Sequence, residues 1–170
     1  MNTVTEIASI KRRFCAYLID VAILLIPNLL IILLLKNFPL ILYLSYMCVN
    51  CSYFTYFISS AAQATPGQQL MNIHTISLDG SKIGLSLAFD RSISQFFLHL
   101  LNNIIAILIE LFQEQNVLVS ALSILGVIIL LLTFCWYSVA CFSQKKQTYH
   151  DMMFGTIVVK GANTGIQGFY

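Results

Sequence analysis

Residues 11–35 read KRRFCAYLIDVAILLIPNLLIILLL. Three basic residues come before an apolar run that is long enough to cross a bilayer, since a membrane-spanning helix needs about 20 apolar residues. Asp20 interrupts this run. A carboxylate at the centre of an inserted helix costs about 2.5–3.5 kcal/mol. A chain that keeps Asp20 there therefore needs either a partner or a use for it.

The composition of the chain is that of a polytopic membrane protein. Of its 170 residues, 58% are hydrophobic and 9% are charged, whereas a soluble domain carries about 25% charged residues. The length predicts a single integral membrane domain over residues 1–170, and the net charge of +2 gives no support to a nucleic-acid partner. The sequence contains no phosphate-loop, dinucleotide or nucleophile-elbow motif.

Four apolar runs predict an all-α membrane protein with four transmembrane helices. The predicted spans are residues 14–35, 38–62, 93–112 and 117–142. The third differs from the others in composition, because it contains several polar residues: Ser94, Gln95, His99, Asn102, Asn103 and Glu110. We expect the first run to remain as a span and not to be cleaved as a signal peptide. It is too long, contains a carboxylate and is followed by no small-x-small cleavage site.

The basic residues predict the orientation of these spans. Every Lys and Arg except Lys36 lies before the first span, between the second and third, or after the fourth. The positive-inside rule places that side, with both termini, in the cytoplasm. We therefore predict a multi-pass protein of a bacterial-type inner membrane with the N and C termini inside.

Asp20 lies about 9 Å inside the first predicted span, at 1.5 Å per residue. Arg13 precedes it by seven residues, close to two helical turns, so both lie on one stripe of the helix. Ala16 lies on the same stripe and is small enough to let another helix approach. Two hypotheses fit this pattern: a structural charge pair, or an ion or proton site.

The third span repeats the pattern with Arg91, Gln95, His99 and Asn102, whose spacing places them on one helical face. His99 is predicted at about the depth of Asp20, where an imidazole and a carboxylate can share a proton. The alternative is that these polar side chains hydrogen-bond other helices within the bundle. Arg91 also fits a simpler role, marking where the span begins.

Two segments outside the spans predict a small β element. Residues 70–78 (LMNIHTISL) alternate after a TPG turn, and residues 155–160 (GTIVVK) form a second candidate strand. We expect the 2–3 loop and the C-terminal tail to pair on the cytoplasmic side. His150 and Asp151 follow the fourth span at the membrane surface where Arg13 also lies.

Three blocks of the sequence resemble the RDD family of membrane proteins, which is named for one arginine and two aspartates. They are RRFCAYLID, TPGQQLMNIHTISLDGSKI followed by FDRSISQF, and KKQTYHDMMFGTIVV. By resemblance the arginine is Arg13 and the aspartates are Asp20 and Asp151. The family often has a lysine after the TPG turn, where this chain has Gln68. This weakens the idea that the turn binds an anion through a basic side chain.

The resemblance implies a probable transport protein, because some family members are linked to sodium–proton exchange. Arg13, Asp20 and Asp151 would then converge near the cytoplasmic leaflet, with a monovalent cation or proton as partner besides the lipid bilayer. Pro27 would free a backbone carbonyl just beyond Asp20, although it also fits a packing kink. Four helices leave little room for a pathway, so we expect a homodimer or larger complex. The alternative is a non-transporting accessory or scaffold subunit.

The cysteines and histidines support catalysis only weakly, and we expect neither an enzyme nor a cofactor. The CVNC segment at 48–51 has the CxxC spacing of thiol oxidoreductases, but it falls inside an apolar span. His74, His99 and His150 have no metal-binding spacing. A CxxC-dependent oxidoreductase is therefore the least favoured hypothesis.

Overall fold

The structure is a computed structural model and describes residues 6–161. Its four long helices are α1 (Ile10–Leu35), α2 (Pro39–Ser59), α4 (Leu85–Leu111) and α5 (Asn116–Phe142). Each is long and apolar enough to cross a membrane. The predicted set of four spans is therefore confirmed.

The largest difference from the predicted bounds is at α4, which begins at Leu85 rather than at residue 93. The apolar run starts late, but the helix already passes through the polar Asp90-Arg91 pair, so Arg91 lies inside α4. Its 27 residues extend about 40 Å at 1.5 Å per residue, which exceeds the thickness of the hydrocarbon core, about 30 Å.

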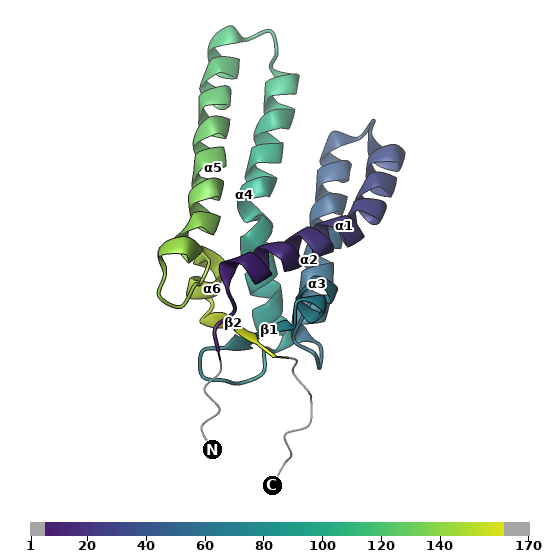
Figure 1. Cartoon of the computed structure of the whole chain (residues 1–170). Coiled ribbons are helices and arrows are strands. Elements are labelled where there is room, and N and C mark those ends of the chain that lie inside the picture. Colours follow the sequence, from purple (N-terminus) through teal and green to yellow (C-terminus); the bar gives the residue numbers. More distant parts are fainter. Residues whose placement is uncertain (1–5, 162–170) are drawn as a thin grey trace, which may run out of the picture.

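The short elements gather at one end of the bundle, which we call the cap (Figure 1). The cap consists of α3 (Pro66–Leu70), β1 (Ile73–Ser77), α6 (Tyr149–Met153) and β2 (Thr156–Lys160). β1 and β2 pair antiparallel, with Thr75 opposite Val158. This confirms the predicted β element. The two ends of the described chain also meet there, because Ile7 bridges Val159.

The long helices form two hairpins whose ends diverge away from the cap (Figure 1). α4 and α5 form one, and α1 and α2 form the other, with α2 packed against α4. The buried residues of α1 are Ala16, Asp20, Leu24 and Asn28, spaced every four positions on one face. Two members of this stripe, Asp20 and Asn28, are polar, so α1 carries an ionisable group and an amide into the protein interior.

Candidate functional site

Asp20 is 2% exposed and lies against the start of α3. Its carboxylate accepts three hydrogen bonds, from Tyr53 Oη (2.8 Å), Thr65 Oγ1 (2.6 Å) and the Gly67 backbone N–H (2.8 Å). The first turn of a helix has free N–H groups and the positive end of the helix dipole, both of which favour a negative charge. The TPG turn therefore does bind an anion, and that anion is a carboxylate of the same chain.

The local sequence of α3 explains this geometry. Thr65 is the N-cap, Pro66 begins the helix, and Thr65 and Gln68 form a reciprocal capping box. Gln68 Oε1 accepts the Thr65 N–H at 3.1 Å, and Gln68 Nε2 donates to Thr75 Oγ1 at 3.2 Å. A lysine has no acceptor, so the glutamine at this position supplies a bond that a lysine cannot make.

Gly67 permits the close approach of α3 to α1. A Cβ atom at this position would lie 2.1 Å from the backbone oxygen of Ala16 and 2.9 Å from Asp20 Oδ1. Ala16 is 1% exposed, which agrees with the predicted role of this small residue. The pair of small residues brings the Gly67 N–H within hydrogen-bonding distance of Asp20.

Asp151 is 1% exposed and is the centre of a second set of contacts. Arg13 Nη1 donates to its Oδ2 at 3.2 Å. Arg91 donates to Oδ1 through Nε at 3.1 Å and through Nη2 at 2.7 Å. Thr148 Oγ1 also donates to Oδ2, at 2.8 Å, as part of the capping box at the start of α6. The carboxylate thus joins α6 to two transmembrane helices, α1 and α4.

The charges around Asp151 fix its protonation state. Burial by itself would raise the pKa of this carboxyl, but the guanidinium groups of Arg91 and Arg13 hold the pKa well below its usual range. Asp151 is therefore ionised at neutral pH. Arg13 also donates to the Val158 carbonyl at 3.1 Å, so the same guanidinium connects α1 to β2.

The structure divides the three predicted cluster residues between these two sets of contacts. Arg13 pairs with Asp151, and among the ion pairs of residues 6–161 none includes Asp20. The expected pairing of Arg13 with Asp20 is replaced by neutral donors from α2 and from the start of α3. Arg91, which the sequence placed only in a supporting polar face, is the closest cation to Asp151.

The other residues of that polar face lie between the helices of the bundle. Gln95 is buried, and its backbone carbonyl accepts a hydrogen bond from Tyr137 Oη at 3.3 Å. The His99 ring lies near the rings of Phe96 and Tyr137. Asn102 faces α5, because a Cβ at Gly126 would lie 3.4 Å from Asn102 Oδ1. The described hydrogen bonds of Asp20 do not include His99.

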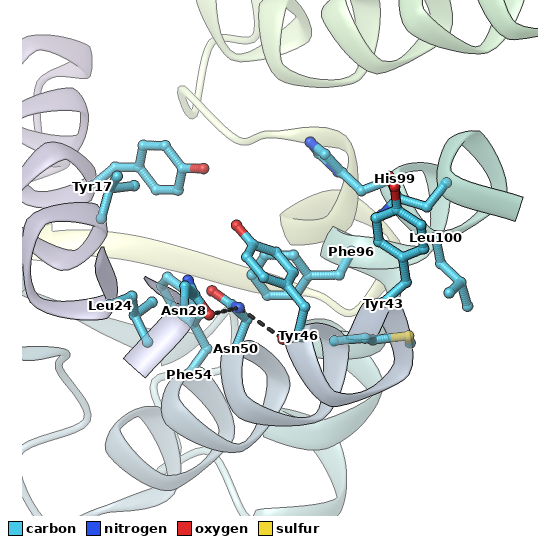
Figure 2. Close-up of a pocket in the computed structure, with 13 residues that line it drawn as sticks. Tyr17, Leu24, Asn28, Tyr43, Tyr46, Asn50, Phe54, Phe96, His99 and Leu100 are labelled. Carbon is cyan, nitrogen blue, oxygen red and sulfur yellow. Dashed lines mark hydrogen bonds between the residues drawn. The ribbon is translucent and has the colours of Figure 1, made fainter. Parts of the chain in front are cut away.

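A cavity of about 100 Å³ lies between α1, α2 and α4, and along α1 it extends from Tyr17, one turn before Asp20, to Asn28. Figure 2 shows several of its polar side chains directed into one space. At its edge, Asn50 Nδ2 donates to Asn28 Oδ1 at 3.1 Å and to the Tyr46 carbonyl at 2.7 Å. The lining residues are Tyr17, Val21, Leu24, Asn28, Tyr43, Tyr46, Met47, Asn50, Phe54, Phe96, His99, Leu100 and Asn103.

His150 is a second buried titratable group in the cap, 4% exposed. Its Nε2 lies 2.9 Å from Thr148 Oγ1 and 3.9 Å from Asp151 Oδ1. Burial, assisted by the positive charges of Arg91 and Arg13, lowers the pKa of His150 to about 3. The imidazole is therefore neutral at physiological pH, although it lies beside a carboxylate.

This burial predicts a specific dependence of stability on pH. The pKa of His150 is about 3 in the folded protein and near 6.5 when exposed, so the unfolded chain takes up the proton first as the pH falls. Stability should therefore decrease below pH 6.5, with a slope approaching about 1.4 kcal/mol per pH unit from this group. Thermal unfolding of the purified protein between pH 7 and pH 4 measures it.

The control for this pH dependence is a comparison of two substitutions. His150→Gln keeps a polar group near Thr148 but does not titrate, so its unfolding midpoint should change less with pH than that of the unmodified protein. His74→Gln removes an imidazole from β1 and leaves His150 in place, so it should keep the full slope. Equal slopes for both variants would contradict the assignment.

The cysteines of the CVNC segment lie one turn apart on α2 as free thiols. Cys51 is buried, with its Sγ 3.8 Å from the Ser92 carbonyl, whereas Cys48 is exposed on the helix. Among the described residues, no three His, Cys, Asp or Glu side chains are placed to hold a metal ion.

The partners of Asp20 and the pairing of two asparagines were not predicted from the sequence. Tyr53, Thr65 and Gly67 all bind Asp20, and the available signal was the TPG turn, which has the composition of a helix start. Asn28 and Asn50 stood out only as polar residues in apolar spans. Their pairing joins α1 to α2 and is visible only in three dimensions.

A comparison with protein-family models matches the chain to the RDD family over residues 7–155. The chain belongs to the RDD family. The matched range includes Arg13, Asp20 and Asp151, which form the two sets of contacts described above. No curated protein matches the chain. No solved structure matches it either.

Proposed function

We propose that this RDD-family protein is a component of monovalent cation and proton exchange, and that Asp20 is its proton-binding carboxylate. The observation that carries the proposal is the difference between the two buried aspartates. Asp151 binds two guanidinium groups, so its protonation would leave two buried cations unpaired. Asp20 is bound only by a phenol, an alcohol and a backbone N–H.

Neutral donors leave Asp20 free to change its protonation state at a lower cost. The hydroxyl groups of Thr65 and Tyr53 can accept as well as donate a hydrogen bond. A proton on Asp20 therefore needs only the rotation of one hydroxyl, with no separation of an ion pair. Tyr17 and Leu24, one turn before and after Asp20 on α1, line the cavity, which supports a short route between the cavity and the carboxylate.

The orientation and assembly that accompany this proposal follow from charge and packing. We propose that the cap faces the cytoplasm of a bacterial-type inner membrane. The reason is that every Lys and Arg except Lys36 lies in a segment on the same side of the predicted spans as the cap. We also propose a homodimer or larger complex. α5 buries only Ile129 and Ala140 within the described chain, and its remaining apolar surface is available to lipid or to a second subunit.

The test is cation-induced proton release from inverted membrane vesicles. Asp20→Asn keeps the acceptor oxygen and the size of the side chain but cannot ionise, so proton release should fall to the level of empty vesicles. Asp79→Asn is the matched control, because Asp79 is an exposed carboxylate in the turn after β1, and it should behave like the unmodified protein. Protein levels in the membrane must be equal.

A second candidate function, a non-transporting accessory subunit, is favoured by a different observation. The hydrogen bonds of Asp151 connect the cap to α1 and α4, and those of Asp20 connect α1 to the cap and to α2. These links support a rigid surface for a partner protein. The vesicle experiment separates the two functions. Proton release that is no greater than in empty vesicles, for the unmodified protein as well, contradicts exchange by this chain alone and favours the accessory function.

A further inference from the structure

The cavity between α1, α2 and α4 has an unused hydrogen-bond acceptor. Asn50 is 4% exposed, and its Nδ2 makes two bonds, to Asn28 Oδ1 and to the Tyr46 carbonyl. Both amide hydrogens are therefore used, while Asn50 Oδ1 accepts no hydrogen bond from the described residues and is directed into the cavity (Figure 2). This acceptor stays available to a molecule in the cavity that Asn50 lines. This arrangement points to a ligand that donates a hydrogen bond.

The walls of the cavity are rich in aromatic rings. Tyr17, Tyr46 and His99 direct their polar atoms towards the same space (Figure 2), and phenol oxygens are further acceptors. Phe54 and Phe96 add rings without a polar group. Aromatic rings attract cations through the negative charge of their faces, so these walls suit a positive ligand with a small apolar part.

The charges near the cavity also favour a positive ligand. No Lys or Arg is among its lining residues, so an anion would find no counter-charge there. Asp20 lies one turn from Leu24 on the buried face of α1, and Leu24 lines the cavity. A carboxylate thus lies close to the site without occupying it.

We propose that this cavity binds a small primary ammonium ion. Its N–H groups donate to Asn50 Oδ1 and to the Tyr46 hydroxyl, and its alkyl part packs against Phe54 and Phe96. The volume of about 100 Å³ fits an ion with a few heavy atoms, since a cavity that holds a single water needs at least about 10–15 Å³. As the identity of the exchanged cation, this inference rests on the proposed function, whereas binding itself does not require transport.

The experiment is calorimetric titration of the full-length protein in detergent with ethylammonium, using 1-propanol as a neutral probe of similar size. Ethylammonium should bind and 1-propanol should not. Asn50→Leu removes the acceptor and should weaken ethylammonium binding about tenfold or more, the usual effect of losing a hydrogen bond to a charged group. Asn116→Leu, the same change at an exposed residue of α5, should leave binding unchanged.

A milder variant covers the case in which Asn50→Leu does not fold. Tyr46→Phe removes one hydroxyl and keeps the ring, so it should weaken ethylammonium binding while the protein elutes and unfolds normally. Equal binding of ethylammonium and 1-propanol overturns the inference, as does unchanged ethylammonium binding in Tyr46→Phe. Ethylammonium binding with no proton release from vesicles would support the ligand site and overturn only the exchange proposal.

Discussion

Asp151→Asn is expected to lower the stability of the protein by about 3–5 kcal/mol, the usual cost of removing one partner from a buried charge pair. Asp151 is 1% exposed and neutralises Arg13 and Arg91, which are themselves largely buried. Asparagine carries no charge, so both guanidinium groups would remain unpaired inside the cap. The change is measured as a drop in the thermal unfolding midpoint at pH 7, where Asp151 is fully ionised.

The control for this prediction is an exposed ion pair in the same cap. Glu6 pairs with Lys160, and the Glu6 side chain is 69% exposed, so Glu6→Gln should change the midpoint little, as is usual for surface pairs. The sign of the pH effect gives a second check. The pKa of Asp151 is lower in the folded state than its usual value of 3.8. The ionised carboxylate therefore contributes fully to the stability of the folded protein above pH 4, and this contribution is lost as the pH falls further. A midpoint for Asp151→Asn equal to that of Glu6→Gln would contradict this account.

Gly67→Ala is expected to separate α3 from α1. The added Cβ would lie 2.1 Å from the Ala16 carbonyl oxygen, and a helix backbone cannot move aside as a flexible side chain can. Overpacking costs about 1–3 kcal/mol and occasionally more, and we expect the upper end here. The Gly67 N–H would also move away from Asp20. The expected results are a lower unfolding midpoint and faster proteolysis within residues 60–72.

Gly84→Ala is the matched control for this close approach. Gly84 precedes α4 with φ −77°, and a Cβ atom there would meet no atom within 4 Å. The same chemical change should therefore have a small effect on the midpoint and on proteolysis. If Gly67→Ala were as stable as Gly84→Ala, the contact between α1 and α3 would not hold Asp20 in place.

The two buried carboxylates differ in how easily each can take up a proton. Asp151 is held by charge, and Asp20 is held by neutral hydrogen bonds. Only the second arrangement allows a proton to be taken up without stranding a buried cation. The Asp20→Asn vesicle experiment and the Asp151→Asn unfolding experiment therefore test different properties. The first should change proton release, and the second should change folding.

Elements with a local signal could be predicted from the sequence. The four spans follow from runs of apolar residues, because hydropathy is summed along a continuous segment. The β1–β2 pair followed from alternation in two short segments. The start of α4 was placed too late, because a helix continues through polar residues when their side chains find partners, as Arg91 does with Asp151.

Which charged residues meet depends on how segments far apart in the sequence pack together. Arg13 and Asp151 are 138 positions apart and Asp20 and Gly67 are 47 apart, and no local pattern encodes such distances. On a helical wheel Arg13 and Asp20 share a stripe, yet the packing of α3 against Ala16 gives Asp20 other donors and leaves Arg13 for Asp151. The physical reason is that a helix sequence fixes the direction of each side chain, whereas the partner in that direction depends on how the other helices pack.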